Sequence, residues 1–219
     1  MESLAESLAR RSVEQTVAER RSSYEEEIRD ILEATYRVIQ RTGSFDPTMR
    51  DLLRESGLST QAFYRHFRSK DELLLLLLDD GRRKLVGYLE HRMDKAATPA
   101  GRIRAWIGGV LAQAENPQAA ARTRPFLANR DRLAETFPEE QQASMDLLVD
   151  LLAGAILALP GRKSDRARAR RDAEAIYDVT FGAVHRYLTH GRRPTAAEIE
   201  HVVRFGLAAV GAHERKRKR

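Results

Sequence analysis

Apolar residues recur at intervals of three and four along most of this chain of 219 residues, which is the spacing of one face of an α-helix. The first clear stripe covers residues 24–39 and ends at Gly43. Later stripes cover residues 145–159, 173–188 and 199–210. No segment keeps the strict alternation of a half-buried strand. The pattern therefore predicts an all-α protein.

Side chains that favour the first turn of a helix stand before several of these segments. They are Thr48, Ser59, Ser69, Thr98 and Thr195. Ser69 and Thr195 are each followed three residues later by Glu, which completes a capping box. In the middle of the chain, Pro117 and Pro125 predict breaks into short pieces. We therefore expect a small three-helix head followed by a larger body of five or six helices.

Residues 48–67 predict two short helices joined at Gly57, a residue that adopts positive φ without steric cost. Phe63 and Phe67 are four apart, so both rings fall on the buried side of the second helix. The other side carries donors and no acid: Thr60, Gln61, Tyr64, Arg65 and Arg68. This pattern is typical of a helix-turn-helix, whose second helix enters the major groove of DNA.

These signals divide the chain into four parts. We expect a mobile N-terminal extension over residues 1–22, the helix-turn-helix domain over 23–70, a helical ligand-binding and dimerisation domain over 71–213, and a basic tail over 214–219.

Composition and charge narrow the function classes. Lys and Arg number 38 against 32 Asp and Glu, with a pI near 9.8, which fits a polyanionic partner. The absence of cysteine excludes disulfides and thiol catalysis. The longest apolar run is Leu73–Leu78, far short of the roughly 20 residues that span a bilayer. We expect a cytoplasmic, nucleoid-associated protein without a membrane partner.

Catalytic and metal-binding patterns are missing from the sequence. The histidines lack metal-ligand spacing, and we find no nucleophile elbow, phosphate loop or carboxylate pair at catalytic spacing. The sequence therefore predicts no enzyme activity, no cofactor and no metal site.

Residues 24–73 resemble the DNA-binding region of the TetR/AcrR family of bacterial regulators. The resemblance rests on Thr48, Leu52, Gly57-Leu58-Ser59, the run from Phe63 to Phe67, and the run from Ser69 to Leu73. It implies an N-terminal head that binds double-stranded DNA and an all-helical body, and it covers about a quarter of the chain.

The resemblance also implies roles for single residues. Ser59, Thr60, Gln61 and Ala62 would face base edges, where Gln61 can pair with adenine and Arg65 with guanine. Tyr64 and His66 would contact phosphates, and Thr48 and Lys70 would clamp the DNA backbone. Arg20 and Arg21 are a possible arm that reaches an adjacent groove.

Two further interpretations concern the body. Aromatic and apolar side chains on its helices are candidates for an effector pocket: Trp106, Phe126, Met145 and Tyr177. The two last helices carry apolar and small residues that suit an isologous homodimer interface: Tyr177, Phe181, Val184, Leu188, Val202, Val203, Gly206 and Val210. Such a dimer would present two recognition helices to a near-palindromic operator.

These patterns favour the hypothesis that the protein is a dimeric repressor, which a small-molecule effector releases from its operator. Two alternatives stay open: an architectural protein that binds DNA with little regard to sequence, and a helical enzyme that carries a borrowed DNA-binding head. The effector, the operator and the direction of regulation do not follow from the sequence.

Overall fold

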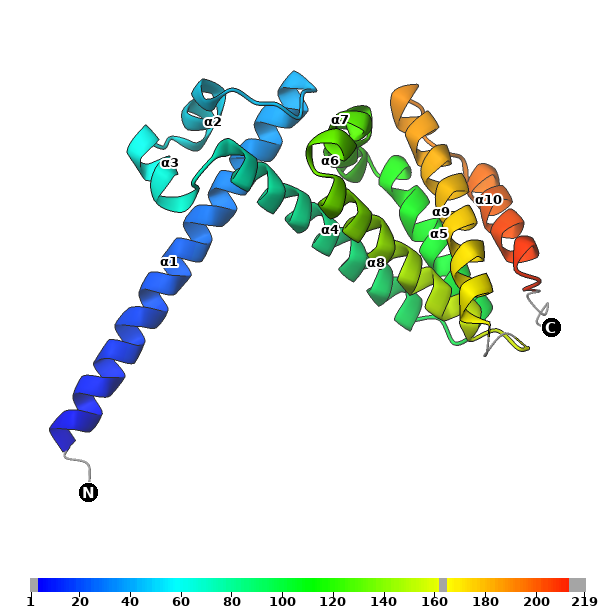
Figure 1. Ribbon diagram of the computed structural model, residues 1–219, viewed down its shortest axis with the longest axis horizontal. Helices are drawn as coiled ribbons and strands as arrows, with labels where there is room; N and C mark the ends of the chain where they lie inside the picture. Colours follow the sequence, from blue (N-terminus) through cyan, green and yellow to red (C-terminus); the bar gives the residue numbers. More distant parts are fainter. Residues whose placement is uncertain (1–3, 162–164, 213–219) are drawn as a thin grey trace. The chain divides into compact units, whose positions relative to one another are not determined.

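The computed structural model describes residues 4–161 and 165–212, and within these ranges the chain forms ten helices and no strand (Figure 1). The helices are α1 (Leu4–Thr42), α2 (Met49–Ser56), α3 (Thr60–His66), α4 (Lys70–Asp94), α5 (Pro99–Glu115), α6 (Pro117–Ala128), α7 (Arg130–Thr136), α8 (Pro138–Leu157), α9 (Arg166–Thr189) and α10 (Ala196–Ala209). The all-α prediction is confirmed. None of these helices is long and apolar enough to cross a membrane.

The chain divides into two compact units, and the division falls inside α4. The head comprises α1, α2, α3 and α4 as far as Leu77. The body comprises the short segment Gly43–Phe45 and the chain from Leu78 onward. The first two turns of α4 therefore pack with the head, although the capping signal at Ser69 had suggested that the head ends near residue 70.

The head is held together by the apolar side of α1. Its residues Ile31, Val38 and Ile39 are buried, as the stripe over residues 24–39 predicts. Tyr36 is also buried and donates a hydrogen bond from its hydroxyl to the carbonyl of Leu77, 3.2 Å away. This bond ties α1 to the first turns of α4.

The described residues 4–22, for which we expected a separate mobile extension, continue α1 as a helix without a break. The reason is local propensity. From residue 4 to residue 42 the chain has neither glycine nor proline and is rich in Glu and Arg, which favour helix even where no apolar stripe is present. The basic tail over residues 214–219 lies outside the described part of the chain.

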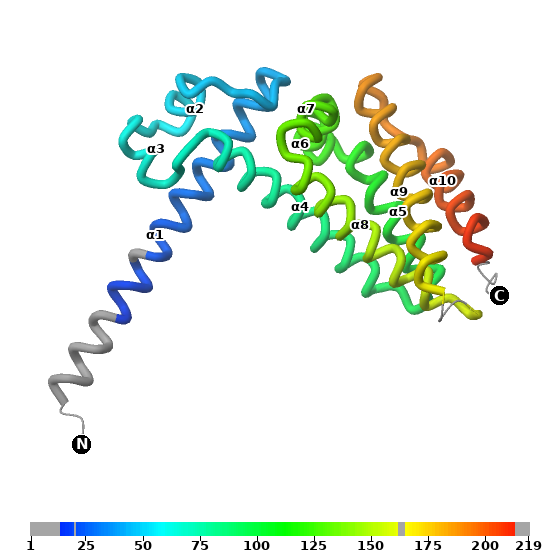
Figure 2. Tube along the Cα trace, viewed as in Figure 1, coloured from blue at the N-terminus to red at the C-terminus, as the bar shows by residue number. Residues whose placement is uncertain are grey.

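The body is built around α5, which contacts α6, α8, α9 and α10. The tubes of these helices can be followed in Figure 2. α5 also approaches α4 closely, because a Cβ added to Gly109 would lie 2.6 Å from a methyl carbon of Leu89. Small residues on α5 therefore set how near the neighbouring helices can come.

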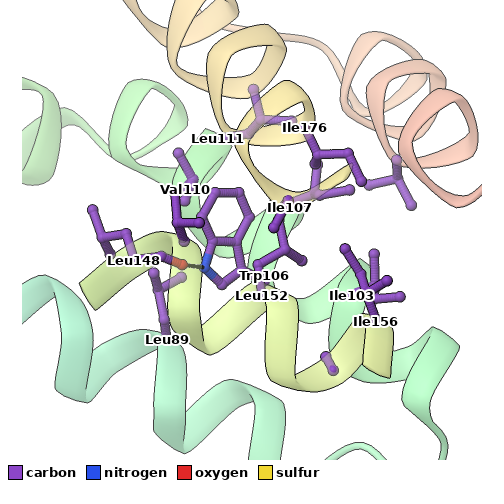
Figure 3. Close-up of a cluster of buried hydrophobic side chains, with 14 of the residues drawn as sticks. Leu89, Ile103, Trp106, Ile107, Val110, Leu111, Leu148, Leu152, Ile156 and Ile176 are labelled. Atoms are coloured by element: carbon purple, nitrogen blue, oxygen red, sulfur yellow. Dashed lines mark hydrogen bonds between the residues drawn. The ribbon is translucent and has the colours of Figure 1, made fainter. Parts of the chain in front are cut away.

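Trp106 lies at the centre of the body core, fully buried among aliphatic side chains from α4, α5, α8 and α9 (Figure 3). Its indole Nε1 donates to the carbonyl oxygen of Leu148 at 3.1 Å, which satisfies the one polar atom of the ring. Around it pack Leu89, Ile103, Ile107, Val110, Leu111, Leu148, Leu152, Ile156 and Ile176.

Pro125 does not break the chain as predicted, because it lies inside the last turn of α6. Its ring is buried, and the helix ends at Asn129, whose side-chain amide donates to the Pro125 carbonyl at 2.7 Å. Packing and this local cap offset the hydrogen bond that proline cannot make. The break after Asn116, in contrast, is confirmed.

Replacement of Trp106 tests the importance of this core. We expect Trp106→Ala to lower the free energy of unfolding of the body by about 3–5 kcal/mol, because it removes a fully buried indole together with the hydrogen bond that the indole donates. Urea unfolding followed by circular dichroism measures the change. Leu147→Ala is the control, since Leu147 is 44% exposed on α8 and should change stability by about 0.5 kcal/mol or less. Equal effects of the two substitutions would contradict this description of the core.

Candidate nucleic-acid interface

The turn between α2 and α3 has the geometry of a helix-turn-helix. Gly57 ends α2 in the left-handed region with φ of 70°, where an L side chain would be strained. Leu52, Phe63 and Phe67 are buried on the inner side, and the centroids of the two phenyl rings are 5.4 Å apart. The helix-turn-helix prediction is therefore supported by the local fold, and the rings hold α3 in place.

Thr48 caps α2 with its side chain. Its hydroxyl accepts a hydrogen bond from the backbone N–H of Asp51 at 3.1 Å and donates one to the Asp51 carboxylate at 2.7 Å. The second bond holds the pKa of Asp51 below its usual value. Arg54 contacts the same carboxylate at 2.7 Å, so the acid is neutralised inside the head rather than left to repel a polyanion. The hydroxyl can donate to a DNA phosphate only if it gives up its bond to the Asp51 carboxylate.

Ser59 performs the same task for α3. It is exposed, and its hydroxyl accepts from the backbone N–H of Ala62 at 3.1 Å. The cap begins the helix at Thr60, which is exposed together with Gln61, while Ala62 is half-buried. The first turn of α3 contains no acid. Polar atoms that can reach base edges are therefore displayed on a short helix with a fixed start.

Tyr64 and Arg65 extend this surface toward the end of α3. The Tyr64 side chain is held at an angle by the edge of the Phe63 ring, with centroids 5.4 Å apart, and the residue remains 55% exposed. The Arg65 side chain is 63% exposed, with its guanidinium 3.4 Å from Glu27 of α1. Lys70 is half-buried and pairs with Asp46. Three of the predicted DNA contacts thus keep a donor near the surface, two of them already beside an acid.

The prediction that His66 contacts a phosphate is contradicted by its burial. Its side chain has no exposed surface, and its ring lies between Tyr24 at 4.8 Å and Phe67 at 6.3 Å. His66 follows Phe63 by three residues and so faces the same side of the helix, a spacing that the sequence already contained. His66 therefore belongs to the packing of α3 on α1.

The possible DNA arm consists of Arg20 and Arg21, and the structure describes the side chain of Arg21 only. Arg21 is highly exposed on α1 and pairs with Glu25 at 2.9 Å, one helical turn later. The side chain of Arg20 lies outside the described part of the structure. α1 carries this segment as a regular helix rather than as an irregular arm.

The four candidate pocket residues lie in different surroundings within the body. Trp106 is core, and Phe126 packs its ring 4.9 Å from that of Phe45. Met145 and Tyr177 are half-buried against the core, and burial raises the pKa of Tyr177 to about 12. Tyr177 stacks on Phe181 with centroids 4.3 Å apart.

A groove of about 410 Å³ lies elsewhere on the body, between the end of α4, α5 and α10. It is lined by small residues on α5, by Arg92 and Glu115, and by the pair formed by Arg104 and Glu200. Sequence reasoning missed this groove, because the charged residues that form it come from three separate segments. Nowhere in residues 4–161 and 165–212 do three acidic or histidine side chains gather in a way that could hold a metal ion.

Most of the residues predicted for a dimer interface are covered by their own chain. The buried ones are Val184, Leu188, Val203, Gly206 and Val210. Gly206 lies so close to α5 that an added Cβ would meet Ile107 at 2.6 Å. Tyr177, Phe181 and Val202 are half-buried against the same core. The five buried residues therefore belong to the body core, so the prediction is wrong for them. It stays a prediction for Tyr177, Phe181 and Val202.

Two large apolar residues remain exposed on the last two long helices. Val179 on α9 is 41% exposed and Phe205 on α10 is 54% exposed. Each lies two residues from a residue that packs in or against the core, Tyr177 and Val203 respectively, and so faces a different side of its helix. In the sequence, the signal for this exposed surface is a large apolar residue that lies outside the apolar stripe of its helix.

The fold and the head define a protein that binds DNA through a helix-turn-helix. Comparison with known proteins identifies the family. The sequence model of bacterial regulatory proteins of the tetR family matches residues 31–77. The HTH-type transcriptional regulator BetI of Brucella canis is 30% identical over 176 residues, which cover 77% of this chain and 83% of that protein. The chain belongs to the tetR family of transcriptional regulators.

Solved structures support the fold. A TetR transcription regulator from Haloarcula marismortui matches with a TM-score of 0.67 and 19% identity, over 85% of this chain and 97% of that one. A putative TetR-family transcriptional regulator from a Rhodococcus species matches with a TM-score of 0.68 and 18% identity, with the same coverage of both chains. At this identity the likeness concerns the arrangement of the helices alone.

Proposed function

We propose that this regulator is a dimeric repressor that binds a near-palindromic operator and leaves it when a small-molecule effector binds the body. The observation that carries the proposal is the first turn of α3, where exposed polar side chains stand on a capped, acid-free helix end. Such a surface suits the edges of base pairs in the major groove. A family of transcriptional regulators supplies the context.

Within the head we assign base reading to residues 59–62 and to Arg65. Gln61 has the amide that pairs with adenine, and Arg65 the guanidinium that pairs with guanine. Tyr64 is a phosphate contact, because its exposed hydroxyl can donate while its ring rests on Phe63. Thr48 and Lys70, at the starts of α2 and α4, lie where free backbone N–H groups also favour an anion.

For the dimer we propose the face that carries Val179 and Phe205 rather than the buried stripes. Apolar side chains of this size gain free energy when a second copy covers them. A two-fold axis through this face brings the same two residues from each copy together. Two recognition helices about 34–36 Å apart would then read successive major grooves on one side of the DNA.

For the effector we propose the groove between α4, α5 and α10. Arg92 contributes a guanidinium that donates to the neutral hydroxyl of Tyr88 at 2.8 Å, so it can still bind an acidic group. Glu115 is exposed at the same groove and offers a carboxylate. An effector with both charges and a small apolar part fits these walls. It need only bind more tightly to a dimer whose heads are wrongly spaced for the operator.

Base reading and phosphate binding respond differently to substitution, which tests the assignments in the head. The operator is obtained by selecting the genomic fragments that the chain retains. We expect Gln61→Ala to lose preference at particular base pairs by about 1–3 kcal/mol, while Tyr64→Phe weakens binding to operator and scrambled DNA alike. Titrations on single-base variants of the operator measure both effects. A uniform loss of affinity in Gln61→Ala would remove its base-reading role.

The dimer face is tested by charge. We expect Phe205→Arg to convert the dimer into monomers, because the substitution buries a charge at the centre of the proposed interface. Sedimentation velocity measures the oligomeric state. Leu147→Arg is the matched control, since Leu147 is 44% exposed on α8 and should leave the dimer intact. Dimers of unchanged stability in Phe205→Arg would place the interface elsewhere.

The groove is tested by filling it. Gly108 lines the groove, and a Cβ added there would meet only the Arg92 guanidinium, at 3.8 Å, so Gly108→Leu places an apolar side chain at the groove without a clash at its Cβ. A ligand present at a hundred times its Kd should stabilise the unchanged chain by about 2.7 kcal/mol in a thermal-shift screen of metabolites. We expect the filled variant to lose that stabilisation and keep its affinity for the operator. Hits that stabilise both proteins equally would exclude this groove as the effector site.

A further inference from the structure

An acid of α1 lies against the end of the recognition helix. One carboxylate oxygen of Glu27, Oε2, is 3.4 Å from Nη2 of Arg65 and 2.7 Å from Nε2 of His66. A carboxylate near a phosphate-binding surface opposes DNA, so its charge weakens binding unless it serves another purpose. Neither the sequence pattern nor the family resemblance assigned a role to this residue.

The ring of His66 lies beside this carboxylate. Its ring is enclosed and rests on Tyr24, one turn before Glu27 on α1. The ring nitrogen is close to the carboxylate but poorly aligned with it, and neither nitrogen of the ring makes a well-directed hydrogen bond within the protein. The contact is therefore one of proximity, and burial rather than a strong bond holds the ring beside Glu27.

Arg65 is the other partner and the one guanidinium of α3. Its side chain is 63% exposed, and its 3.4 Å contact with Glu27 is long for a charge-assisted hydrogen bond. An exposed ion pair of this kind is weak, so a phosphate or a guanine can compete for the guanidinium. Until such a competitor binds, Glu27 keeps the guanidinium of Arg65 close to α1.

We propose that Glu27 is a specificity-determining residue of the head. It restrains Arg65 so that this guanidinium adds little to binding of DNA of arbitrary sequence, and releases it where the operator offers a better partner. Glu27 thereby lowers background affinity more than operator affinity. The inference rests on the proposed binding of an operator by this head.

The test compares Glu27→Gln with Glu26→Gln in the full chain. The two substitutions remove the same charge from neighbouring positions on α1, and Glu26 is exposed. Gln also keeps an oxygen beside His66. Fluorescence anisotropy titrations on scrambled duplex at several KCl concentrations give the affinity for scrambled DNA and its salt dependence. Titrations on the operator then give the ratio of operator affinity to scrambled affinity.

We expect Glu27→Gln to bind scrambled DNA about 2–5-fold more tightly than Glu26→Gln does, because this factor corresponds to the free energy of an exposed ion pair. The slope of log K against log salt should steepen by about 0.9, the value for one added phosphate contact. The ratio of operator to scrambled affinity should fall. All three changes should vanish in an Arg65→Gln background, which a merely structural role of Glu27 would not produce.

Equal behaviour of the Glu27 and Glu26 variants would overturn the inference, as would a Glu27 effect that persists without Arg65. Arg65→Gln alone gives a second test that leaves Glu27 in place. Because the restrained guanidinium contributes little to background binding, we expect its loss to change affinity for scrambled DNA by less than about twofold, and a larger loss contradicts the proposal. An unchanged chain that binds no DNA would instead remove the proposed function itself.

Discussion

Burial of Phe63 and Phe67 is the constraint on which the DNA-binding surface depends. α3 has seven residues, and a helix of that length is not stable in water by itself. The two rings, covered by the rest of the head, supply the packing that keeps it folded. Gly57 sets the turn that lets the rings enter the core, and Ser59 fixes the residue at which the helix begins. The exposed side of α3 is therefore as well defined as the packing of its inner side.

The same inner side explains why α1 matters to DNA recognition. His66 packs against Tyr24 of α1, and Glu27, one turn later on the same helix, lies within reach of Arg65. The orientation of a base-reading side chain is then influenced by a helix that makes no base contact of its own. In the body, Trp106 has a comparable place, since helices α4, α5, α8 and α9 meet around it.

Local signals in the sequence predicted much of this structure. The caps Thr48, Ser59, Thr98 and Thr195 depend on neighbouring backbone groups alone, and each one forms as expected. Placement that depends on distant partners was harder to predict. The stripe of α9 shows that one side of the helix is buried, but periodicity does not tell whether α5 or a second copy of the chain covers Val184. His66 was misassigned for a related reason, because its polarity outweighed its spacing from Phe63.

Sequence-selective binding is the claim that the rest of the account requires. The most direct measurement is the ratio of affinities for a selected genomic fragment and for a scrambled duplex of the same length and composition, at one fixed salt concentration. A regulator with a base-reading first turn on α3 should prefer its operator by about a thousandfold or more. Equal affinities for the two DNAs would contradict the account and favour an architectural DNA-binding protein.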